Sequence, residues 1–139
     1  MNILNKKRIM KKTEFIVQTL DKTITSDKMH ELREHLDSDF SHLVGIAISD
    51  IRCSPKAILN LVKVKGIEIL PEDFELAHII TSANVEPNSR FYTMFEPIST
   101  SGDEITVRFT DSTFHSNYNL QIHLLLTNQP ENIKRANFS

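Results

Sequence analysis

The sequence predicts a mainly β protein, an antiparallel β-sandwich or single jelly roll of about seven or eight strands with one short helix near the N-terminus. Three observations support this fold class. Short runs rich in β-branched and aromatic residues recur along the chain, turn residues separate them, and only one segment has helical periodicity. An α/β enzyme would instead alternate helices with strands. The 139 residues, 40% hydrophobic and 24% charged, suit one folded domain.

The N-terminal part of the domain supplies a strand and the helix. Residues 13–20 form a β-rich run that predicts the first strand. Ser26 has the character of an N-cap, and apolar residues follow it at spacings of three, four and four: Met29, Leu32, Leu36 and Phe40. Because three and four residues bring side chains to one helical face, this spacing predicts a helix over residues 27–37.

The rest of the domain is expected to be strands and turns. Further strands are predicted over residues 43–51, 57–64, 74–80, 90–95, 105–109 and 118–127. Gly45 indicates a bulge in the first of these. In the last, Tyr118, Leu120, Ile122 and Leu124 share one face, and Asn119, Gln121 and His123 share the other. This alternation is typical of a strand with one buried face.

Charge is unevenly distributed along the chain. The net charge is −2, but residues 1–12 carry +5 and no acid, which leaves −7 on the rest. The five basic residues are Lys6, Lys7, Arg8, Lys11 and Lys12. We therefore expect a basic arm over residues 1–12, a β-sandwich domain over 13–128 and a polar tail over 129–139. The arm is either a solvated terminus or a contact for a polyanion or partner surface, such as a genome or an acidic inner surface.

No motif in the sequence predicts catalysis, a cofactor or a metal site. His30 and His35 are five residues apart, whereas a zinc-protease helix needs histidines four apart. Cys53 is the only cysteine, which excludes an internal disulfide. The acids Glu68, Glu72, Asp73 and Glu75 surround a turn without the spacing of a cation-binding loop. We expect a protein that is not an enzyme, without cofactor or metal, made in the cytoplasm without a secretory signal or transmembrane segment.

The densest aromatic run in the sequence lies at residues 90–95. On a strand, Phe91 and Phe95 would face one side while Tyr92 faces the other. Core packing explains such residues in many strands. Because both faces here are partly apolar, we also expect Phe91, Tyr92 and Phe95 to lie at a subunit interface.

Several segments of the chain resemble those of a known class of proteins. They are the "Gly-Ile" at Gly45-Ile46, the stretch 65–75 (KGIEILPEDFE), the stretch 84–92 (NVEPNSRFY) and the closing run 119–128 (NLQIHLLLTN). In this order, over roughly residues 43–128, they resemble small β-sandwich, jelly-roll-like virion structural proteins of phages that infect Bacteroidetes-type bacteria. The shared segments are structural turns and strands rather than catalytic signatures.

The resemblance implies a non-enzymatic protein located in the virion. It would be a minor capsid, vertex (penton-like) or capsid-associated component that assembles as a homo-oligomer and with other capsid proteins. The competing expectation is a carbohydrate- or receptor-binding β-sandwich module. Its exposed loops, such as Pro87-Asn88 or residues 114–117, would carry the ligand.

Overall fold

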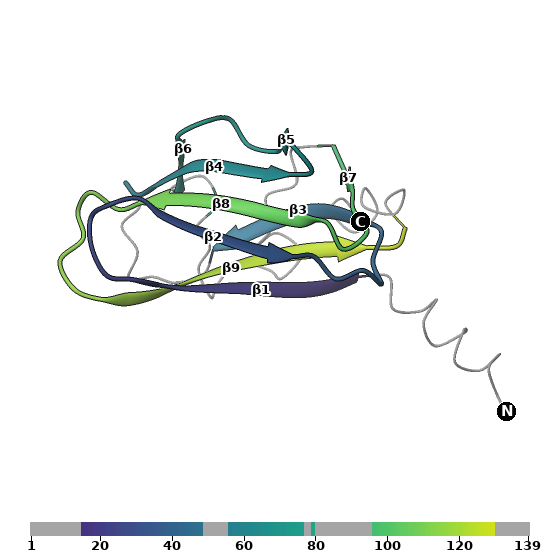
Figure 1. The fold of residues 1–139 in the computed structure, drawn as a ribbon, viewed down its shortest axis with the longest axis horizontal. Helices are drawn as coiled ribbons and strands as arrows, with labels where there is room; N and C mark the ends of the chain where they lie inside the picture. Colours follow the sequence, from purple (N-terminus) through teal and green to yellow (C-terminus); the bar gives the residue numbers. More distant parts are fainter. Residues whose placement is uncertain (1–14, 49–55, 77–78, 80–95, 130–139) are drawn as a thin grey trace, which may run out of the picture.

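The computed structural model describes residues 15–48, 56–76, 79 and 96–129, and within these the chain is mainly β with no α-helix. The strands are β1 (Phe15–Ile24), β2 (His30–His35), β3 (His42–Ile48), β4 (Ile58–Val64), β5 (Ile67–Glu68), β6 (Phe74–Glu75), β7 (Ile98–Ser99), β8 (Glu104–Thr110) and β9 (Tyr118–Thr127). They form two antiparallel sheets (Figure 1). Sheet A has the order β1-β9-β3-β7. Sheet B has the order β2-β8-β4-β5, with β6 also paired to β4.

Strand pairing in the two sheets is nested. The first strand pairs with the last, β1 with β9, and the second pairs with the last but one, β2 with β8. Inside these pairs, β3 pairs with β7, and β4 pairs with β5 and β6. The contacts of β9 with β3 and of β8 with β4 then complete the sheets. Long-range pairing therefore dominates the architecture.

The inward faces of the two sheets share one hydrophobic core. Leu120, Ile122 and Leu124 of β9 in sheet A are fully buried, as are Ile105 and Val107 of β8 in sheet B. All belong to a single cluster of buried side chains. Burial of each such aliphatic side chain contributes about 1.5–3 kcal/mol. Because these residues alternate along the strands, their burial determines which face of each sheet turns toward the core.

The structure confirms most of the predicted strands among the described residues. The strand predicted over 118–127 is β9, those over 57–64 and 105–109 match β4 and β8 within one residue at each end, and the first strand continues to Ile24. The register of β3 on β9 shifts between Leu43 and Gly45, which confirms the bulge. Of the strand expected over 74–80, the structure describes β6, and residues 77, 78 and 80 lie outside the described residues. The one expected over 90–95 lies outside the described residues.

The helix predicted over residues 27–37 is wrong, because this segment contains strand β2. Leu32 lies opposite Val107 of β8 and faces the core, while Met29 is 56% exposed instead of sharing its face. Leu36 is buried beyond the strand, where its N–H donates to the Asp103 carbonyl at 2.9 Å. The apolar spacing was compatible with both structures, and pairing with β8 decides in favour of the strand.

Candidate functional site

The edge of sheet A is formed by a long strand, β1. It pairs with β9 over ten residues, from Phe15 opposite Thr127 to Ile24 opposite Tyr118. On its other side no strand pairs with it within the described part of the chain. Near its beginning Ile16 is 36% exposed and Val17 48%. A long edge with exposed apolar side chains is a surface on which another strand can pair.

One side chain of β1 connects the two sheets. The Gln18 amide donates to the Glu34 carboxylate at 3.2 Å and to the His35 carbonyl at 3.0 Å. Its own oxygen accepts the Asp37 N–H at 2.8 Å. Because His35 ends β2, Gln18 ties the edge of sheet A to the edge of sheet B at this point.

The outer face of sheet A carries a polar row across β1 and β9, formed by Thr19, Asp21, Asn119, Gln121 and His123. Asp21 Oδ1 accepts from Asn119 Nδ2 at 3.1 Å and from Gln121 Nε2 at 3.0 Å. Thr19 Oγ1 and His123 Nδ1 lie 2.8 Å apart. Burial lowers the pKa of His123, and the nearby Asp21 carboxylate opposes this only in part. The row offers amide, hydroxyl and carboxylate groups of the kind that bind polar ligands.

The outer face of sheet B is charged rather than neutral. Glu31 of β2 accepts from Arg108 Nε at 2.8 Å and from Arg33 Nε at 2.9 Å. Both hydrogen bonds lower the pKa of the Glu31 carboxyl, and the bond from Arg108 has the larger effect. The two sheets thus present chemically different surfaces.

Several residues singled out in the sequence lie outside the described residues. They are the basic arm (Lys6, Lys7, Arg8, Lys11 and Lys12), the aromatic residues Phe91, Tyr92 and Phe95, and Cys53.

The structure places His30 and His35 on strand β2, where their odd separation directs them to opposite faces. His30 Nδ1 lies 2.8 Å from the Lys28 carbonyl, and His35 Nδ1 lies 2.9 Å from the Gly102 carbonyl. Among the described residues no three His, Cys, Asp or Glu side chains gather closely enough to hold a metal ion.

The sequence indicated the part of the polar row that lies on β9 but not the part that lies on β1. The alternation in residues 118–127 placed Asn119, Gln121 and His123 on one face. Thr19 and Asp21 join them only because β1 pairs with β9, and no local signal specifies that pairing.

No helix in the described segments is long and apolar enough to cross a membrane. In comparisons with known proteins, no family model, no curated protein and no solved structure matches the chain.

Proposed function

We propose that the chain is a non-enzymatic structural protein of a bacteriophage virion, with a single jelly-roll fold. It would serve as a minor capsid, vertex or capsid-associated subunit. The observation that carries the proposal is the nested strand pairing, in which β1 pairs with β9 and β2 with β8 around the inner pairs. The sequence segments that resemble phage structural proteins support the same role.

The strand order supports a jelly-roll fold. Counting β5 and β6 as one interrupted strand, each sheet contains four strands, and the connections from β1 to β4 and from β7 to β9 cross between the sheets. A long hairpin folded over in this way, with eight strands in two sheets, is the jelly-roll arrangement. Viral capsid proteins and lectins both use this arrangement, and the exposed β1 edge adds support for assembly.

The β1 edge is the surface we assign to assembly. Its outer side has no strand partner in the described structure, and Ile16 and Val17 are exposed on it. A second copy of the chain could pair there about a two-fold axis, which buries the same residues from both subunits. The charged residues of β1, Asp21 and Lys22, lie in its second half, so its first half lacks the charges that keep natural edge strands from pairing.

The test is the solution mass of the full chain, measured by light scattering over a range of protein concentrations. We expect an oligomer, and we expect Val17→Lys to raise its dissociation constant by about tenfold or more, because the charge would be desolvated at the contact. Ile67→Lys is the matched control. It adds the same charge at an equally exposed β-branched side chain on β5, away from the β1 edge, and should leave the mass unchanged.

A full chain that stays monomeric at every concentration would contradict the proposal, and equal effects of the two variants would exclude the β1 edge. A monomer would favour the second candidate function, a carbohydrate- or receptor-binding module. The observation that favours it is the polar row, because Asn119, Gln121 and Asp21 present hydrogen-bonding groups on an open sheet face.

A further inference from the structure

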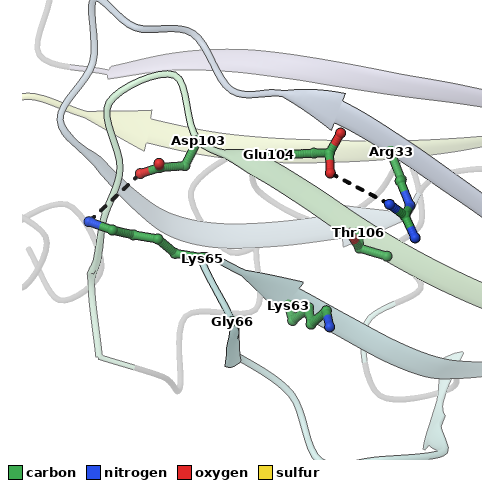
Figure 2. A pocket seen from close by; sticks show the side chains of 7 residues that line it. All are labelled: Arg33, Lys63, Lys65, Gly66, Asp103, Glu104 and Thr106. Carbon is green, nitrogen blue, oxygen red and sulfur yellow. Dashed lines mark ion pairs between the residues drawn. The ribbon is translucent and has the colours of Figure 1, made fainter.

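The outer face of sheet B contains an open hollow of about 310 Å³. Seven residues line it: Arg33, Lys63, Lys65, Gly66, Asp103, Glu104 and Thr106 (Figure 2). They come from β2, β4, β8 and the turns beside them. None of these residues belongs to the β1 edge, so the hollow is independent of the assembly surface.

Strand register builds the floor of the hollow. Thr106 of β8 lies directly opposite Arg33 of β2 on one side and Lys63 of β4 on the other. Directly opposite residues in antiparallel strands point to the same face. The three side chains therefore form one row, in which a hydroxyl lies between two cationic groups.

Thr106 is the central donor of this row. The residue is only 6% exposed, and among the described residues its hydroxyl has no hydrogen-bond partner. No buried side-chain nitrogen or oxygen of the described residues lacks a partner, so this hydroxyl is accessible from the hollow rather than enclosed in the core. Because Thr106 lines the hollow, a bound group is positioned to accept this hydrogen bond.

The cations of the hollow are incompletely neutralised. Lys63 makes no ion pair with a described residue, although Glu68 lies opposite it in β5. Lys65 Nζ is 3.8 Å from Asp103, and Arg33 Nη1 is 3.9 Å from Glu104, both beyond hydrogen-bond distance (Figure 2). Arg33 also donates to the Glu31 carboxylate at 2.9 Å, so the two lysines are the less neutralised cations of the lining.

The turn between β4 and β5 places Lys65 at the rim in an unusual conformation. Lys65 has φ of 59° and Gly66 has φ of 77°, as in a type I′ hairpin turn. Asn or Asp is preferred at the first of these positions, and a long side chain there is uncommon. Such a residue persists where the surrounding structure or a function favours it.

We propose that this hollow binds a phosphate group, with the Thr106 hydroxyl and the Lys63 and Lys65 ammonium groups as donors. Phosphate offers several acceptor oxygens and matches the positive charge of the two lysines. The hollow, at about 310 Å³, is larger than a single phosphate ion requires. It therefore has room for a phosphate attached to a small organic molecule.

The experiment is a titration of the full chain with inorganic phosphate and with adenosine monophosphate, at constant ionic strength, followed by amide NMR shifts. We expect saturable shifts at Gly66 and Thr106. Lys63→Gln should weaken binding by about tenfold, and the isosteric Thr106→Val by several-fold. Lys28→Gln removes an exposed lysine outside the hollow and should leave binding unchanged.

Each outcome bears on the site. Tighter binding of the nucleotide supports a phosphate carried by an organic molecule, and equal binding supports the free anion. Shifts that do not saturate, shifts that chloride reproduces, or variants that fold normally and bind equally would overturn the site. Lys65→Gln serves as a second variant if Thr106→Val does not fold. None of these results affects the assembly proposal, which is measured by mass.

Discussion

At the scale of single residues, the polar row places a half-buried imidazole on the outer face of sheet A. The pKa of His123 is lowered from 6.5 by burial, because the charged ring would lose its hydration. The folded state then binds fewer protons than the unfolded state below about pH 7. The free energy of unfolding is therefore highest, as far as His123 is concerned, above its unfolded-state pKa of 6.5. It decreases as the pH falls from this value through the lower pKa of the folded state.

We therefore expect His123→Gln to reduce the loss of stability between about pH 7 and pH 5, measured as the urea midpoint at each pH. Thr19→Val is the control, since it removes the hydroxyl beside Nδ1 but keeps the titrating ring. The control should retain the wild-type direction of the pH dependence. Equal slopes for wild type and His123→Gln would show that another group is responsible.

At the scale of elements, the edges of the two sheets are joined through Gln18. Its side chain makes three hydrogen bonds, one of them to the partly buried Asp37 N–H. Gln18→Ala should lower the free energy of unfolding by about 1–2 kcal/mol, because the Asp37 N–H loses its acceptor. Urea unfolding measures this. Gln121→Ala, which removes one exposed hydrogen bond, should change stability by less than about 0.5 kcal/mol. Equal losses would contradict a special role for Gln18.

Strands in which apolar and polar residues alternate could be predicted from the sequence. Strands that form only because they pair with a strand far away in the sequence could not. Residues 118–124 alternate regularly, and the strand predicted over 118–127 has the same ends as β9. In β2, Glu31 and Arg33 interrupt the apolar pattern, and they are tolerated there because Arg108 of β8 lies opposite Glu31. That neighbour is 77 positions away, so local periodicity carried no information about it. The hollow escaped prediction for the same reason.

At the scale of the whole molecule, charge is divided between the first residues and the rest. Residues 1–12 carry +5 against −7 elsewhere, so the arm can attract either a polyanion or an acidic surface of another copy. Removing residues 1–12 should weaken assembly, most strongly at low salt, without lowering the urea midpoint. Light scattering over a salt series measures the first effect and urea unfolding the second. A truncated chain that assembles as well as the full chain would rule out this role for the arm.

The pairing of β1 with β9 also has a consequence for the order of events during synthesis. Thr19 and His123 are neighbours across this pair although 104 positions separate them in sequence. At a translation rate of about 5–20 residues per second, β1 waits several seconds or more before its partner has been made. Through that interval the side chains of Leu20 and Ile24, which the folded domain buries, remain uncovered on an unpaired strand. Sheet A can close only when β9 leaves the ribosome, so the folding of this domain is a late, slow step, exposed to capture by chaperones or by neighbouring nascent chains.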